Sequence, residues 1–154
     1  MKVTVLVIGE LVQGVNELMT ERGIEQAKAH QKRIADFDQV RECVYSGTSI
    51  SHEQMAQFLG LNVNFSSPIF GNGYSSNVLG KGENDRSEFY RAQQRFASLD
   101  HKIALQTLLD IPDGSLIICD PEFVIAVCGR PADYGTAWQL IYDTESVIYF
   151  KMVS

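Results

Sequence analysis

The segment from Val3 to Ile8 constrains the fold more than any other part of the chain. It is an unbroken run of apolar and β-branched residues, and it stops at Gly9. Such a run is typical of a central parallel strand that is covered on both faces. In α/β folds, ligands bind at the carboxyl ends of such strands. We therefore expect an α/β fold with functional residues just after this strand.

Helix and strand signals alternate beyond this point. Thr20 can cap a helix over residues 21–36, in which apolar side chains recur at helical spacing. Short strands are predicted at 43–46 and 61–65, the second from its alternating apolar and polar residues.

The helix between those two strands begins near Ser49 or Ser51 and ends at Gly60, a residue suited to a helix C-terminus. Strands separated by helices in this way indicate right-handed crossovers and a largely parallel sheet.

The middle of the chain is less regular. Residues 69–82 are rich in Gly, Asn and Ser, which predicts a surface loop, and loops of this length are often functional. Asp85 and Glu88 form a candidate capping box for a long amphipathic helix that ends before Pro112. That helix is expected to break near Asp100.

Strand and helix signals alternate again in the last third of the chain. A buried strand is predicted at 116–119, and Asp120-Pro121-Glu122 is a strong helix start for a short helix that Gly129 closes. Residues 136–142 and 147–153 favour a β-hairpin, with a helix for 136–142 left open.

Together these elements predict one domain over residues 1–154, a three-layer α/β/α sandwich with a mostly parallel central sheet.

Composition excludes several classes of function. The net charge of −6 and the absence of a dense basic cluster argue against nucleic acid or an anionic membrane as partner. No secretory signal or membrane span is recognised, so a cytoplasmic location is expected. Cys43, Cys119 and Cys128 form no CxxC pair, and we interpret them as packing residues. No HxH, HExxH or CxxC spacing is present, so neither a metal nor a cofactor is expected.

Three segments carry a resemblance to a known family. Leu6–Glu10 stands where that family has Leu-Val-Arg-His-Gly-Glu, Leu18–Ala27 is similar to its Leu-Thr-Glu-Arg-Gly-x-Glu-Gln-Ala helix start, and Val44–Gly47 precedes a helix in the same order. In these segments the chain resembles the histidine phosphatase superfamily, which has the phosphoglycerate-mutase-like fold. In length and tail it is most similar to the small bacterial phosphohistidine-phosphatase branch.

The resemblance implies a specific chemistry. In the family a histidine after the first strand takes the phosphoryl group, two arginines and a second histidine bind the phosphoryl oxygens, and a carboxylic acid protonates the leaving group. Here Val7 and Ile8 replace the Arg-His pair before Gly9, Ser51 falls at the second arginine, and Asp120 falls at the second histidine. Valine and isoleucine side chains can neither attack phosphorus nor donate a hydrogen bond, and a carboxylate at position 120 repels phosphate.

The loss is large in free energy. Each charge-assisted hydrogen bond contributes roughly 1.5 to 3 kcal/mol, so two arginines and a histidine account for several such bonds. The sequence therefore predicts a catalytically degenerate domain.

Some side chains could still serve the cleft next to Gly9. His52 could be a displaced nucleophile or anion ligand, although a histidine in the first turn of a helix is more often exposed or a capping residue. Glu10 could be a general acid, or could hydrogen-bond nearby backbone donors. His30 and His101 are expected on the surface of helices.

Further candidates lie in the middle of the chain. Glu83, Asp85 and Glu88 lie where the family often supplies its acid, but all three could simply be solvated, and Asp85 and Glu88 also fit the capping box. Arg86 and Arg130 could form a replacement anion site. Tyr74, in a segment of small polar residues, suits recognition of a protein or small polar ligand, although an ordinary long loop is the simpler interpretation. Asp120 is more simply explained as a helix cap than as a catalytic group.

The favoured function is non-catalytic: binding an unknown protein or small-molecule ligand, or acting as a scaffold or dimerising subunit, with a homodimer left open. The alternative is a phosphatase or mutase-like hydrolase that uses non-standard residues such as His52 and Glu10 on a phosphomonoester or phosphohistidine. A third reading, unrelated chemistry in the altered pocket, has no recognisable constellation behind it.

Overall fold

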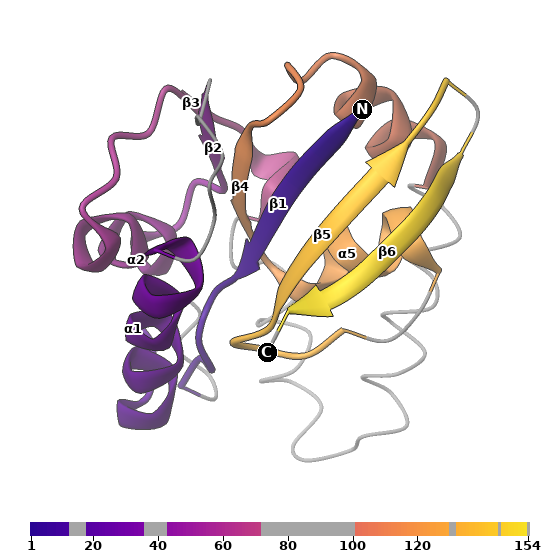
Figure 1. Cartoon of the computed structure of the whole chain (residues 1–154). Helices are drawn as coiled ribbons and strands as arrows, with labels where there is room; N and C mark the ends of the chain where they lie inside the picture. Colours follow the sequence, from indigo (N-terminus) through magenta and orange to yellow (C-terminus); the bar gives the residue numbers. More distant parts are fainter. Residues whose placement is uncertain (13–17, 36–42, 72–100, 130–131, 145, 154) are drawn as a thin grey trace.

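A six-stranded sheet organises the computed structural model (Figure 1). The structure describes residues 1–12, 18–35, 43–71, 101–129, 132–144 and 146–153. The strands are β1 (Lys2–Val7), β2 (Val44–Ser46), β3 (Phe65–Ser66), β4 (Leu116–Cys119), β5 (Ala137–Tyr142) and β6 (Val147–Val153).

The strand order is β3-β2-β4-β1-β5-β6, so the first strand of the chain lies inside the sheet. Strands β3, β2, β4 and β1 run parallel, whereas β5 is antiparallel to β1 and β6 is antiparallel to β5. The register pairs Val5 with Ile117 on one side and with Trp138 on the other. The predicted central, doubly covered strand is confirmed.

Helices lie on both faces of this sheet. On one face, α1 (Glu21–Ala35) and α2 (Ile50–Leu59) enclose a core with Leu6 and Ile8. On the other face, α5 (Pro121–Cys128) and the helical residues 101–109 pack against Val5 and Val7. Figure 1 shows α5 behind the sheet and α1 and α2 beside its opposite face. The predicted three-layer α/β sandwich is confirmed.

Local signals account for the ends of the helices. The Gly23 N–H donates to Thr20 Oγ1 over 2.9 Å, so Thr20 caps α1 as predicted. Gly60 ends α2 and Gly129 ends α5, both in the left-handed conformation that suits glycine.

One predicted strand is wrong in its extent, because only Phe65 and Ser66 of the segment from residue 61 onward join the sheet. The Asn64 side chain accepts from the Val44 N–H over 2.8 Å, in the place of a backbone carbonyl. Leu61 and Val63 instead pack against the core under α1 and α2. The alternation of apolar and polar residues in this segment therefore comes from packing against the helices and not from strand pairing.

The hairpin formed by β5 and β6 is confirmed, so the helix left open for residues 136–142 is wrong. The expected loop from residue 69 starts as a short 3₁₀ helix, Pro68–Phe70, with Phe70 buried. The rest of that loop lies outside the described residues, as do Tyr74, Glu83, Asp85, Arg86, Glu88 and Arg130. No helix in the described part of the chain is both long and apolar enough to cross a membrane.

Candidate functional site

The residues at the end of β1 belong to the core. Val7 and Ile8 are both fully buried, Val7 in the core on the α5 side and Ile8 in the core under α1 and α2. The Ile8 N–H donates to the Cys119 carbonyl over 3.0 Å. The two positions that the resemblance assigns to an Arg-His pair therefore hold packing side chains.

Gly9 touches the backbone of α1. A Cβ added to Gly9 would lie 1.8 Å from the Gly23 carbonyl oxygen, and one added to Gly23 would lie 2.1 Å from the Glu10 carbonyl oxygen. No side chain fits between these two backbones, so both glycines are required by the close approach.

Glu10 braces the connection between β1 and α1. Its Oε1 accepts from Thr20 Oγ1 over 3.1 Å, and its N–H donates to Gln26 Oε1 over 2.9 Å. The Thr20 N–H also donates to the Glu10 carbonyl. These contacts hold the start of α1 against the end of β1.

Ser51, His52 and Asp120 are brought together. His52 Nε2 lies 3.0 Å from Asp120 Oδ1, and His52 Nδ1 lies 2.5 Å from Ser49 Oγ. Ser49 Oγ is in turn 2.7 Å from Ser51 Oγ. No residue of this Ser–His–Asp cluster (Ser49, Ser51, His52 and Asp120) is more than 3% exposed. The expected exposure of His52 is wrong.

Two members of the cluster occupy helix N-cap positions without capping. Ser49 precedes α2 and Asp120 precedes α5, as the sequence predicts, but neither side chain makes a capping hydrogen bond. Both side chains contact His52 instead. The expectation that Asp120 acts as a cap is right for its position and wrong for its side chain.

Glycines enclose the pair of His52 and Asp120. A Cβ on Gly47 would lie 2.5 Å from His52 Nε2, and one on Gly71 would lie 2.3 Å from the Asp120 carboxyl carbon. Gly71 has a φ of 137°. The Asp120 N–H donates to the Phe70 carbonyl and the Thr48 N–H to the Gly71 carbonyl, which fixes this segment over the cluster.

The contact between His52 and Asp120 is close but not aligned. Among the described residues, neither His52 Nε2 nor Asp120 Oδ1 has a hydrogen-bond partner of good geometry, although the two atoms are 3.0 Å apart. Polar atoms that are taken out of water and only partly paired cost free energy. Burying this cluster in the core therefore costs free energy of folding, and such a cost is typical of a functional site.

Sequence reasoning missed a second buried histidine. His30 is fully buried, its Nε2–H donates to the Val7 carbonyl over 2.9 Å, and Arg33 Nη1 donates to its Nδ1 over 2.8 Å. Burial lowers the pKa of His30 to about 4, against the favourable Val7 contact and with a further lowering from the Arg33 charge. The expected surface position of His30 is wrong.

The signal that could have placed both histidines is spacing. His30 follows Ala27 by three residues and precedes Ile34 by four, on the buried stripe of α1. His52 precedes Met55 by three residues on the buried stripe of α2. His101 is exposed, as predicted, with Nδ1 2.6 Å from the Ala126 carbonyl.

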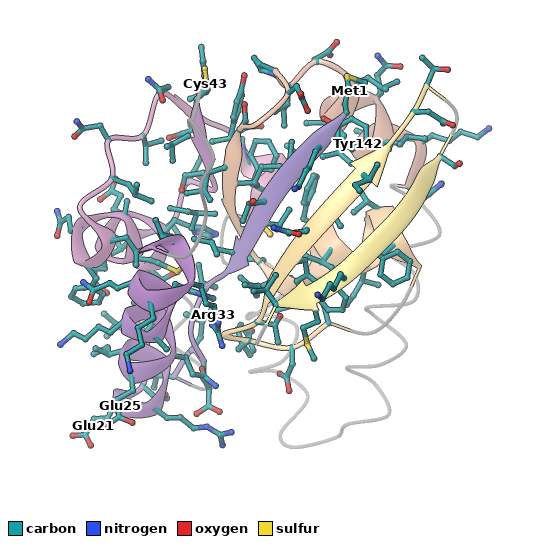
Figure 2. The ribbon with its side chains drawn as sticks, viewed as in Figure 1. Met1, Glu21, Glu25, Arg33, Cys43 and Tyr142 are labelled. Carbon is teal, nitrogen blue, oxygen red and sulfur yellow. The ribbon has the colours of Figure 1, made fainter. Side chains whose placement is uncertain are left out.

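Arg33 links three elements at the end of β1. Besides His30, its Nη1 reaches the Gly135 carbonyl over 2.9 Å, and the Gly135 N–H donates to the Ile8 carbonyl. In Figure 2, Arg33 projects from α1 toward the lower end of β1. Arg33 therefore holds α1, the end of β1 and the segment before β5 together.

Two of the cysteines are poor nucleophiles. Burial raises the pKa of Cys119 far above its usual value and that of Cys128 to about 12. Neither of these cysteines forms a disulfide, and Cys43 is also free. Among the described residues, no three His, Cys, Asp or Glu side chains are grouped as a metal site requires.

Solved structures share this fold. The chain is similar to TTHB049 from Thermus thermophilus, with 15% identity, a TM-score of 0.67 and coverage of 97% of this chain and 98% of that one. A phosphoglycerate mutase from the same organism gives 16% identity and a TM-score of 0.67, with 100% of both chains covered. Phosphoserine phosphatase from Entamoeba histolytica, in complex with 3-phosphoglyceric acid, has 13% identity and a TM-score of 0.59, with 99% of this chain and 95% of that chain covered.

No protein-family model matches the sequence, and no curated protein matches it either. The likeness therefore rests on the arrangement of the strands and helices along nearly the whole chain. In that arrangement the chain resembles the histidine phosphatase superfamily and has its phosphoglycerate-mutase-like fold.

Proposed function

We propose that the chain is a catalytically degenerate histidine-phosphatase-like domain over residues 1–154. It does not transfer phosphoryl groups, and its role is to bind a protein or small-molecule partner or to act as a scaffold. The proposal includes a cytoplasmic location, which the free cysteines favour.

The observation that carries the proposal is the Asp120 carboxylate. It lies at the position that the resemblance assigns to a phosphate-binding histidine, buried and 3.0 Å from His52 Nε2. Two like charges about 4 Å apart repel by about 4 kcal/mol at an effective dielectric constant of 20. Phosphate would meet this repulsion where the fold usually supplies attraction.

The buried end of β1 supports the same conclusion. Ile8 packs in the core, and the resemblance assigns its position to the phosphoryl-accepting histidine. An alkyl side chain cannot form the covalent intermediate, and no rotation of a buried side chain restores a nucleophile there.

The alternative, a phosphatase built on His52 and Glu10, finds less support. His52 contacts Ser49 and Asp120, whereas the Glu10 carboxylate contacts Thr20, so these contacts share no residue. A nucleophile and its proton donor must converge on one substrate.

Phosphatase assays test the proposal directly. Purified protein should not hydrolyse p-nitrophenyl phosphate or a phosphohistidine peptide above the rate of a buffer control. Turnover that persists through purification, vanishes in His52→Ala and survives in the matched Glu53→Ala variant, whose side chain is exposed on the same helix turn, would overturn it.

Ligand binding gives an independent measurement. Thermal unfolding in the presence of phosphate or vanadate should match unfolding in chloride at equal ionic strength. An upward shift of several degrees with either oxyanion, at concentrations well above a plausible Kd, would reveal an intact anion site and contradict the proposal.

A further inference from the structure

The geometry points to Ser49 as a nucleophile for acyl transfer, with His52 as its base, Asp120 as the positioning residue for that base, and a small activated carboxylic ester as the class of substrate. This activity is separate from the proposed loss of phosphoryl transfer. A Ser–His–Asp arrangement is recognised by distances and roles, and it recurs in unrelated folds.

The contacts provide the first part of the argument. The Ser49 hydroxyl lies 2.5 Å from His52 Nδ1, while Asp120 Oδ1 lies 3.0 Å from Nε2 on the other side of the ring. A carboxylate beside Nε2 favours the tautomer with its proton there, which leaves Nδ1 free to accept the Ser49 proton. Nε2 of the His52 ring therefore faces the carboxylate, and Nδ1 accepts the proton of the serine.

The second part is the helix that Ser49 leaves uncapped. Because the Ser49 side chain makes no capping hydrogen bond, it does not use the first-turn N–H groups of the ten-residue helix α2. These groups, from Ile50 and Ser51, lie next to the reacting hydroxyl in sequence. Their N–H dipoles suit the negative oxygen of a tetrahedral intermediate.

The third part is the cost of the cluster. Ser49 and Asp120 both leave helix caps to contact His52, and each lost cap destabilises the helix that it precedes. His52 Nε2 and Asp120 Oδ1 are buried without an aligned partner among the described residues. Gly47 and Gly71 are close enough that a methyl group would collide with the pair.

The reaction balances without a cofactor. Ser49 Oγ attacks the ester carbonyl carbon, its proton passes to His52 Nδ1, and the bond to the leaving alcohol oxygen breaks as that oxygen takes the proton. Water then attacks the acyl-serine with His52 again accepting a proton, which releases the acid and restores Ser49. Because Ser49 is only 2% exposed, access to its hydroxyl is restricted, and the proposed substrates are limited to small acyl groups such as acetyl.

A fluorophosphonate probe, which labels activated serines, tests the nucleophile on the full-length wild-type protein. One adduct should form, and fragmentation of the peptide by mass spectrometry should place it on Ser49. Labelling should rise with pH to a plateau, as general-base activation of a serine requires. Absence of any adduct at millimolar probe, under conditions that label a known serine hydrolase, overturns the inference, as does an adduct on another residue.

Variants separate chemistry from structure. His52→Gln and Asp120→Asn should each slow labelling by at least about a hundredfold, and Asp120→Asn should also flatten its pH profile. Ser115→Ala removes a buried serine whose hydroxyl donates to the Pro112 carbonyl, outside the cluster, and should leave labelling unchanged.

Labelling of folded His52→Gln at the wild-type rate overturns the inference. If these variants do not fold, the wild-type adduct and its pH profile decide the question. Hydrolysis of p-nitrophenyl acetate that follows the same pattern supports turnover. None of these outcomes depends on the phosphatase assays, so either proposal can fail alone.

Discussion

At the scale of single residues, His30 is an imidazole that the fold holds in its neutral form. Its Nδ1 accepts from Arg33, and its Nε2–H donates to the Val7 carbonyl, so a second proton has no acceptor and meets the guanidinium charge. The pKa near 4 reflects this burial.

The fold should therefore lose stability in acid through this residue. The unfolded chain takes up a proton near pH 6.5 and the folded chain only near pH 4, so the free energy of unfolding falls as the pH drops between these values. The loss should approach about 3 kcal/mol. Urea unfolding of the wild type from pH 7.5 to 4 measures it, and His30→Gln, which keeps a donor for Val7, should remove most of the slope. An equal slope in both proteins would contradict this account.

Gly9 and Gly23 make a second residue-scale prediction. Gly9→Ala should destabilise the protein by about 3 kcal/mol, because a Cβ would overlap the backbone of α1. Gly60→Ala is the matched control: nothing lies within 4 Å of its Cβ position, and only the left-handed backbone costs about 1 kcal/mol. Chemical denaturation compares the three proteins, and equal losses would argue against the backbone contact.

At the scale of elements, the Ser–His–Asp cluster joins α2 to the connection between β4 and α5. The contact between His52 and Asp120 spans these elements, while the Phe70 and Gly71 carbonyls bind the backbone on either side. Neither N-cap side chain makes a capping hydrogen bond to the helix that it precedes. Asp120 thus makes a long-range contact with His52 in place of a local cap.

A double-mutant cycle measures that contact. His52→Ala and Asp120→Ala should each destabilise the protein, and the double variant should lose less than the sum, with a coupling of roughly 1 to 3 kcal/mol. Asp113 is exposed and accepts from the Lys2 N–H, so Asp113→Ala combined with His52→Ala should be additive. A coupling near zero for the first pair would mean that the 3.0 Å contact contributes nothing.

At the scale of the whole molecule, the fold was more predictable from sequence than the site. Thr20, Gly60 and Pro121 are local signals, and each marks a helix end in the structure. The burial of His52 and the orientation of Asp120 depend on each other although the two residues are far apart in the sequence, and no local pattern encodes such a contact. The strand predicted over 61–65 is mostly absent because Leu61 and Val63 pack against the core under the helices and do not pair in the sheet.

The position of β1 gives a prediction for the whole chain. Its neighbours in the sheet are β4 and β5, both from the last third of the sequence. A fragment of residues 1–115 should therefore lack cooperative unfolding by circular dichroism, whereas the full chain should unfold in one transition. A sharp transition in the fragment would show that α1, α2 and the first three strands are stable alone.

The same arrangement has a consequence for synthesis in the cell. Residues 2–7 leave the ribosome well before the strands that flank them at 116–119 and 137–142. At about 5 to 20 residues per second, an apolar strand stays unpaired for several seconds. During that interval the nascent chain exposes an apolar strand that can pair with another chain. We therefore expect the yield of the protein in cells to depend on chaperones more than its stability alone implies.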